Sequence, residues 1–127
     1  MTTGMGSWAP PAGLDAELTA TGVHFDALRL PAYLGGRVRA ILGKRCGAVV
    51  RDPYGHYLYF LSERGAAADW RIPEAACAKL LGKGCWIVVP PSHRVQAGDL
   101  RWISNPTEGR LRTPARCLRD ALDCAQL

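Results

Sequence analysis

Short apolar or alternating segments recur along this chain, and their period predicts β-strands. Apolar and polar side chains alternate over residues 23–27, in a segment that continues to Leu30, whereas residues 85–89 form a continuous apolar run between Gly84 and Pro90. Alternation is typical of a half-buried strand, and a short apolar run is typical of a buried one. Residues 100–103 predict a further strand.

Residues 46–61 predict a β-hairpin. An apolar segment at residues 46–50 and an aromatic-rich segment at residues 56–61 flank Asp52-Pro53-Tyr54-Gly55. Proline in the second place and glycine in the last are typical of a type I turn. Strands joined by so short a connection pair antiparallel.

Helical spacing or helix-start signals alternate with these strands. The segments concerned are residues 14–20, 31–42, 74–81 and 114–126. Pro31 suits the first position of a helix, and Gly43 suits its end. Thr113 is expected to cap the last helix, with Pro114 at its first position. This order of elements predicts an α+β fold, with helices packed on a mainly antiparallel sheet.

The length of 127 residues fits one compact domain. We expect a flexible tail at residues 1–12, rich in Gly, Thr and Pro, and a single α+β domain at residues 13–127. No apolar run reaches the roughly 18 residues of a membrane span. Residues 1–11 hold no Lys or Arg and no apolar core, so we expect that they are not a signal peptide. These features predict a cytoplasmic protein with no membrane partner.

Cysteine chemistry is not indicated by the five cysteines of the chain. They are Cys46, Cys77, Cys85, Cys117 and Cys124. Their number is odd, and no pair has the spacing of a zinc knuckle. We therefore predict reduced, mostly buried thiols, no metal site and no cofactor.

The formal net charge is +5, and the basic excess is uneven. Residues 93–119 hold six arginines, Arg94, Arg101, Arg110, Arg112, Arg116 and Arg119, against Asp99 and Glu108. Arginine without lysine favours planar, bidentate recognition of phosphate or carboxylate. The alternative is a solvated basic face, because a bias toward Ala, Gly and Arg is typical of a GC-rich genome such as an actinobacterial one.

The apolar run at residues 85–89 ends at Pro90-Pro91, and Ser92, His93 and Arg94 follow. Two prolines fix φ at consecutive residues and supply no backbone donor, so the chain must leave the sheet in one direction. The corner is either a plain turn or the rim of a pocket for an anion.

Three motifs stand in a defined order along the chain. They are Gly55-His56-Tyr57-Leu58-Tyr59-Phe60, Val88-Val89-Pro90-Pro91-Ser92 and Arg101-Trp102, and a helix introduced by proline follows them. In this order and spacing, residues 46–126 resemble the C-terminal half of the bifunctional DNA primase/polymerase domain of the archaeo-eukaryotic primase superfamily. The resemblance implies a partial primase/polymerase-like domain with an RRM-like sheet. In such a sheet, residues 56–61 and 85–89 are expected to be neighbouring strands.

The acidic residues that carry catalysis in that family are missing. Two-metal chemistry needs clustered carboxylates, yet the aspartate expected upstream of Pro90 falls on Lys79 or its neighbours. The chain has no Asp-x-Asp pair, and the family's histidine aligns best with Tyr57, one residue after His56. On a strand, one residue means the opposite face. The resemblance therefore implies a degenerate, non-catalytic domain.

Nine residues are candidates for weak binding of a nucleotide or single-stranded nucleic acid. They are His56, Tyr57, Ser92, His93, Arg94, Arg101, Trp102, Arg110 and Arg112. The arginines would supply charge, and the aromatic residues would stack on bases. The pattern nevertheless favours Trp102 as an anchor of the core, and it favours His56 as a residue that faces solvent beside the turn.

Two other functions stay open. The Leu, Trp and Tyr residues near short strands suit a protein-interaction or regulatory module that keeps the fold without binding a ligand. His24 and Asp26 have the spacing of a general base and its orienting acid on one strand face. Ser92-His93 is a weaker pair for an enzyme, since adjacent side chains point apart.

Overall fold

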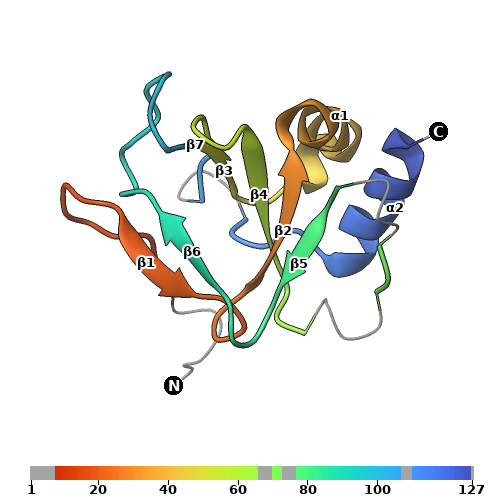
Figure 1. The fold of residues 1–127 in the computed structure, drawn as a ribbon, viewed down its shortest axis with the longest axis horizontal. Coiled ribbons are helices and arrows are strands. Elements are labelled where there is room, and N and C mark those ends of the chain that lie inside the picture. Colours follow the sequence, from red (N-terminus) through yellow and green to blue (C-terminus); the bar gives the residue numbers. More distant parts are fainter. Residues whose placement is uncertain (1–7, 66–69, 73–76, 107–109, 127) are drawn as a thin grey trace.

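The computed structural model describes residues 8–65, 70–72, 77–106 and 110–126. Within them, two α-helices and two antiparallel sheets confirm the α+β class (Figure 1). The strands are β1 (Glu17–Ala20), β2 (Asp26–Pro31), β3 (Val49–Asp52), β4 (Tyr57–Ser62), β5 (Lys79–Leu81), β6 (Trp86–Val89) and β7 (Arg101–Ser104). The helices are α1 (Ala32–Leu42) and α2 (Ala115–Ala125), and a 3₁₀ turn, η2 (Gly43–Arg45), follows α1.

The larger sheet has the strand order β5-β2-β4-β3-β7, with antiparallel neighbours. The predicted hairpin is confirmed, because β3 pairs antiparallel with β4 and Asp52 faces Tyr57. The carboxylate of Asp52 accepts hydrogen bonds from the backbone N–H groups of Tyr54 and Gly55, at 3.0 and 3.2 Å. Aspartate commonly closes turns in this way.

Helices α1 and α2 pack against each other and cover one face of the larger sheet (Figure 1). Leu28 and Leu30 of β2, with Leu58 and Phe60 of β4, are buried under them. Because side chains alternate along a strand, the intervening residues of β2 and β4 face the other side of the sheet. Helix α1 and the β3–β4 hairpin are both confirmed, and the packing of the helices on one face leaves the other face of the sheet turned away from them.

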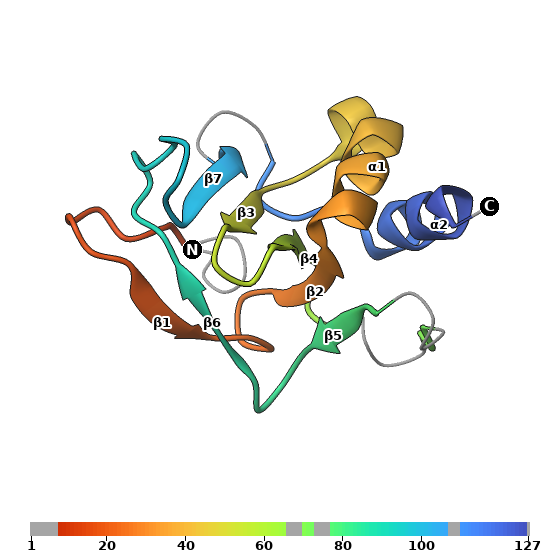
Figure 2. The ribbon, with the colours of Figure 1, turned by 45° about the horizontal axis from the view of Figure 1, so that its top comes forward.

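β1 and β6 form a separate two-stranded ribbon on the opposite side of the larger sheet from the helices (Figures 1 and 2). Ile87 and Val89 of the ribbon are buried in a second core together with Phe25 and Trp102. The larger sheet is therefore apolar on both faces where an element covers it.

Two of the predicted helical segments are wrong. Residues 17–20 form a strand and not a helical turn, since β1 pairs with β6. Lys79–Leu81 form β5, which pairs with β2, so the helix predicted at residues 74–81 does not include these residues. Residues 73–76 lie outside the described residues. Tertiary pairing overrides local propensity in both segments.

Thr113 does not cap α2 as predicted. Thr113 is buried, its Oγ1 accepts a hydrogen bond from the N–H of Gly47 at 2.7 Å, and Pro114 is the N-cap residue. The carboxylate of Glu63 instead accepts a hydrogen bond from the backbone N–H of Ala115 at 2.8 Å. A side chain distant in sequence therefore supplies the cap.

Trp8 and Pro11, within the tail predicted at residues 1–12, contact the domain. The ring of Trp8 packs edge-on against Phe25, with ring centroids 5.0 Å apart. The carbonyl of Pro11 accepts a hydrogen bond from the N–H of Ser92 at 3.0 Å. Burial of an indole ring holds this segment against the second core, which composition alone does not indicate.

The strand adjacency implied by the primase resemblance is also wrong. β4 lies between β2 and β3 in the larger sheet, whereas β6 pairs with β1 in the ribbon. Residues 56–61 and 85–89 are therefore not sheet neighbours. The reason is that β1, which the local pattern does not predict, provides the pairing partner of β6.

Candidate functional site

The Pro90-Pro91 corner is held from inside the protein. The indole N–H of Trp102 donates to the carbonyl oxygens of Pro90 and Pro91, at 3.2 and 3.1 Å. Both prolines are buried, and the Asn105 amide donates to the carbonyl of Ser92 at 3.1 Å. The corner carbonyls thus serve the packing of Trp102, and the corner is a structural turn.

Trp102 has the core role that the sequence allowed and not the stacking role. Its side chain is 2% exposed within the second core. A base cannot stack on a ring that the protein already covers on both faces.

Three of the arginines expected to supply charge to a bound nucleic acid donate hydrogen bonds to carbonyl groups of the protein. Arg94 donates through Nη2 to the carbonyl of Leu14 at 2.6 Å, and Arg101 donates through Nη1 to the carbonyl of Asp99 at 3.4 Å. Ser92 is half-buried and His93 is exposed at the corner. Arg94 therefore holds the segment before β1, and its own carbonyl accepts a hydrogen bond from the N–H of Trp102 at 3.0 Å.

Arg112 supports the turn before β2. Its Nε donates to the carbonyl of His24 at 2.8 Å, and burial lowers the pKa of its guanidinium despite the attraction of Glu63. His24 precedes β2, and the carboxylate of Asp26 accepts a hydrogen bond from the Gly65 N–H at 3.0 Å. These contacts do not favour the predicted His24–Asp26 catalytic pair.

A cluster of basic and aromatic residues lies on the face of the larger sheet opposite the helices. We call Arg29, Tyr57, Tyr59 and Lys79 the Arg29–Tyr57 cluster. Arg29 of β2 pairs with Tyr59 of β4 on one side and with Lys79 of β5 on the other. Directly paired residues share a sheet face, as do residues two apart on one strand. Three strands therefore bring these four side chains together.

The guanidinium of Arg29 is stacked on Tyr57. Its central carbon lies 4.5 Å from the centroid of the Tyr57 ring, within the range of a cation–π contact. The rings of Tyr57 and Tyr59 are 6.4 Å apart in an edge-to-face arrangement. Tyr57 and Arg29 are half-buried and Lys79 is exposed, so the cluster remains accessible from solvent.

The electrostatics of the cluster centre on Tyr59. Burial and the nearby carboxylate of Asp52 raise the pKa of the Tyr59 hydroxyl, while the charge of Arg29 and a hydrogen bond from it oppose that shift. The Nε of Arg29 is buried and has no hydrogen-bond partner among the described residues. The guanidinium is therefore positioned by its ring contact and by Tyr59.

His56 lies at the end of the turn before Tyr57. It is exposed, its φ is 59°, and its carbonyl accepts a hydrogen bond from the N–H of Ala32 at 2.8 Å. Of the nine residues proposed from the sequence, the structure thus places Tyr57 in the cluster and His56 next to it. Arg29 and Lys79 were missed, although Arg29 is the polar residue between Leu28 and Leu30 that marks the outer face of β2.

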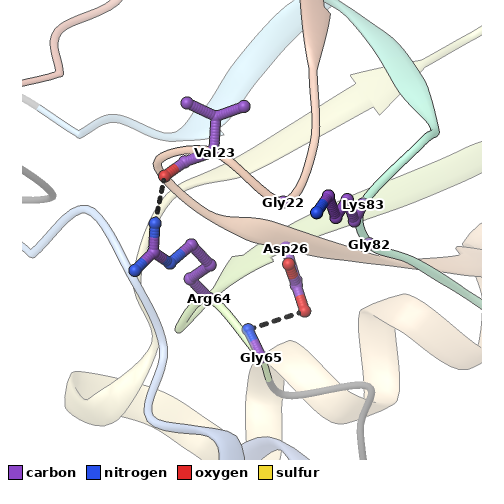
Figure 3. A pocket seen from close by; sticks show the side chains of 7 residues that line it. All are labelled: Gly22, Val23, Asp26, Arg64, Gly65, Gly82 and Lys83. Atoms are coloured by element: carbon purple, nitrogen blue, oxygen red, sulfur yellow. Dashed lines mark hydrogen bonds between the residues drawn. The ribbon is translucent and has the colours of Figure 1, made fainter.

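Turns from three parts of the chain meet at an open pocket of about 640 Å³. Figure 3 shows the residues that line it. Asp26 in its wall is 2% exposed and binds Gly65, while Arg64 donates through Nη1 to the carbonyl of Val23 at 3.3 Å. The charged groups join the turns to each other, and we assign this pocket a structural role.

Close backbone packing supports that role for the pocket. Gly22, also in the wall, has φ +83°, and a Cβ there would lie 2.5 Å from the backbone of Lys83. The hydroxyl of Thr21 donates to the carbonyl of Gly82 at 2.6 Å. The turn before β2 is therefore fixed against the turn before β6.

Among the described residues, no group of three His, Cys, Asp or Glu side chains is placed to hold a metal ion. The cysteines are free thiols, but Cys77 and Cys124 are exposed and Cys46, Cys85 and Cys117 are only half-buried, so the prediction of mostly buried thiols is wrong. In the same part of the chain, no helix is long and apolar enough to cross a membrane.

Comparison of the chain with models of protein families, with curated proteins and with solved structures finds no match.

Proposed function

We propose that this protein binds single-stranded nucleic acid or a nucleotide in the cytoplasm, without catalysing polymerisation, through the Arg29–Tyr57 cluster. The observation that carries this proposal is the guanidinium of Arg29 at 4.5 Å over the Tyr57 ring, beside Lys79 and Tyr59 on one sheet face.

Basic and aromatic side chains on one sheet face provide the two contacts that single strands need. Bases stack on aromatic rings or on guanidinium planes, and ammonium and guanidinium groups attract the phosphates. The net charge of +5 favours association with a polyanion. Binding through these contacts is expected to show little sequence preference, because each base has a π face.

We do not propose catalysis, because the sequence lacks the clustered acidic residues that the resembled family uses. The chain has no Asp-x-Asp pair, and lysines stand where the resembled family has an aspartate. A degenerate primase/polymerase-like origin stays a hypothesis that rests on the order of the sequence motifs. It adds no support here, since the strand adjacency it implies is not found among the described strands.

A matched pair of lysine variants tests the proposal. Lys79→Gln removes a charge from the cluster, and Lys83→Gln removes the same charge from an exposed position at the structural pocket. We expect Lys79→Gln to weaken binding of a fluorescent oligothymidylate in an anisotropy titration, while Lys83→Gln leaves it near the wild-type value. Wild-type affinity should fall linearly with the logarithm of salt concentration. Absence of binding at low salt, or equal effects of both variants, would refute the proposal.

A second candidate function is self-association through the outer face of the ribbon. Leu18, Trp86 and Val88 are 65%, 58% and 45% exposed there, and Leu18 pairs directly with Val88 across the two strands. We take a second copy of this chain as the partner, because identical apolar faces and strand edges can pair about a two-fold axis. Light scattering during size-exclusion chromatography tests this. A wild-type monomer at high concentration, or a Trp86→Glu variant that remains dimeric, would exclude it.

A further inference from the structure

A groove between the end of α1 and β7 gathers cationic side chains that the proposed function does not use. Three adjoining pockets of about 320, 510 and 290 Å³ form it, and they share Arg39, Cys46, Ser104 and Asn105 between them. Lys44 and Arg110 line the third. We call these six residues the Arg39 groove, and we infer that it binds a phosphorylated small molecule.

Arg39 is fixed in the wall of the groove. Its Nε donates to Oγ of Ser104 at 2.9 Å, and its Nη2 donates to the carbonyl of Ile103. A guanidinium has five N–H donors in a rigid fork, so two bonds to β7 orient the group and leave further donors for an anion. Orientation before binding reduces the entropy lost when a ligand is held.

Lys44 and Arg110 supply further positive charge from different parts of the chain. Lys44 follows α1, and Arg110 lies between β7 and α2. Both are exposed, and among the described residues no carboxylate lines any of the three pockets. Arg39 lines the first two pockets, and Lys44 and Arg110 line the adjoining third one. Cations around adjoining polar pockets attract a multiply charged anion more strongly than a monovalent one.

Two features would oppose an anion here, and each is offset. The carboxyl end of a helix carries partial negative charge, but Arg45 donates to the last carbonyls of α1, those of Leu42 and Ile41, at 3.4 and 3.3 Å. A thiolate at Cys46 would repel phosphate, yet burial raises the pKa of that thiol, despite hydrogen bonds with Ser104 and Thr113 and the charge of Arg39. The thiol is therefore neutral at physiological pH.

The polar floor completes the chemistry of the groove. Ser104 and Asn105 follow one another at the end of β7, and the backbone at Gly43 and Gly47 forms part of the opposite wall. A hydroxyl group can donate a hydrogen bond to a phosphate oxygen, whereas the Asn105 amide already donates to the carbonyl of Ser92. Charge and hydrogen-bond donors thus point to a phosphate ester or pyrophosphate.

Inorganic pyrophosphate is a suitable probe, titrated into the ¹⁵N-labelled protein at constant ionic strength. We expect saturable shifts of the backbone amides of Gly43, Gly47 and Arg110. Lys44→Gln and Arg110→Gln should each weaken binding about three- to tenfold, the usual size of one charge contact to an anion. Arg37→Gln is the matched control, because Arg37 is exposed on α1 and does not line the groove.

The outcomes separate this inference from the proposed function. Lys79→Gln should leave pyrophosphate binding unchanged, since Lys79 belongs to the other cluster. Pyrophosphate shifts that persist when oligonucleotide binding fails would support the groove by itself. Shifts that do not saturate, or an equal loss in Arg37→Gln, would overturn it. Arg39→Gln is left out of the test because it would also remove a hydrogen bond between α1 and β7.

Discussion

The indole N–H of Trp102 donates to the carbonyl oxygens of both Pro90 and Pro91, and this contact holds the corner at the end of β6. The contact joins β7 of the larger sheet to the end of the ribbon strand β6. The side chain of Trp102 therefore links the two sheets within the second core. Of the two roles that the sequence left open for the proline pair, a plain turn or the rim of a pocket, these contacts favour the turn.

Trp102→Phe tests the structural role of this contact. The change keeps an aromatic ring in the core but leaves two buried carbonyls without their donor, so we expect the free energy of unfolding to fall by about 1–3 kcal/mol. Urea denaturation measures it. Trp86→Phe is the control, because Trp86 is 58% exposed and its replacement should change stability by less than about 0.5 kcal/mol. Equal losses in the two variants would contradict the assignment.

Gly35→Ala and Gly36→Ala should have opposite effects, although the two residues are adjacent in α1. A Cβ at Gly35 would lie 2.7 Å from Cδ1 of buried Leu58, and overpacking of this kind costs about 1–3 kcal/mol. A Cβ at Gly36 meets nothing within 4 Å, so alanine there should add about 0.5–1 kcal/mol of helix stability. Thermal unfolding compares them. The same sign in both variants would refute the packing of α1 on β4.

Glu63→Ala removes the cap of α2. We expect a loss of about 1 kcal/mol in unfolding free energy, because the Ala115 N–H loses its carboxylate acceptor and Pro114 offers no side-chain cap. Glu63→Gln keeps an oxygen acceptor and should lose less. Glu17→Ala, at an exposed position of β1, serves as the control. If Glu63→Ala matches that control in urea denaturation, the cap does not contribute.

Alkaline pH should destabilise the protein through Cys46 and Tyr59. Burial raises the pKa of both groups above their ordinary values of 9.0 and 10.0, so the folded state holds these protons more tightly than the unfolded state. Their contribution to stability is complete below about pH 9 and is lost as pH rises above it. Urea midpoints at pH 8 and pH 10.5 measure the loss. Cys46→Ala should reduce it, whereas Cys124→Ala, at an exposed thiol, should not.

Variants of Tyr57 separate stacking from hydrogen bonding in nucleic-acid binding. Tyr57→Phe keeps the ring under Arg29 and should retain affinity for oligothymidylate, whereas Tyr57→Ala should lose about 1–3 kcal/mol, the usual contribution of one stacked base. Tyr54→Ala is the control, because Tyr54 is 80% exposed in the adjacent turn. Circular dichroism confirms that each variant is folded. A Tyr57→Ala variant that is folded and binds normally would exclude the cluster as the site.

Part of the candidate site could be read from the sequence, and part could not. Tyr57 was a candidate because the resemblance aligns the family's histidine with it, and the local pattern places it in the second strand of the hairpin. Arg29 and Lys79 become its neighbours through the pairing of β2 with β4 and β5, across long intervals of sequence. The arginines of residues 94–112 look like one strip along the chain but contact different segments, because turns separate them.

The sequence by itself determined the α+β class, helix α1 and the β3–β4 hairpin. These elements depend on interactions between residues close in the chain, namely the spacing of apolar side chains, an initiating proline and a turn closed by Asp52. Only the tertiary structure decided that β1 pairs with β6, that Lys79 lies in a strand, and that Trp102 is buried under the proline corner. Such pairings arise where apolar faces from distant segments are buried together, and a local pattern does not specify its partner.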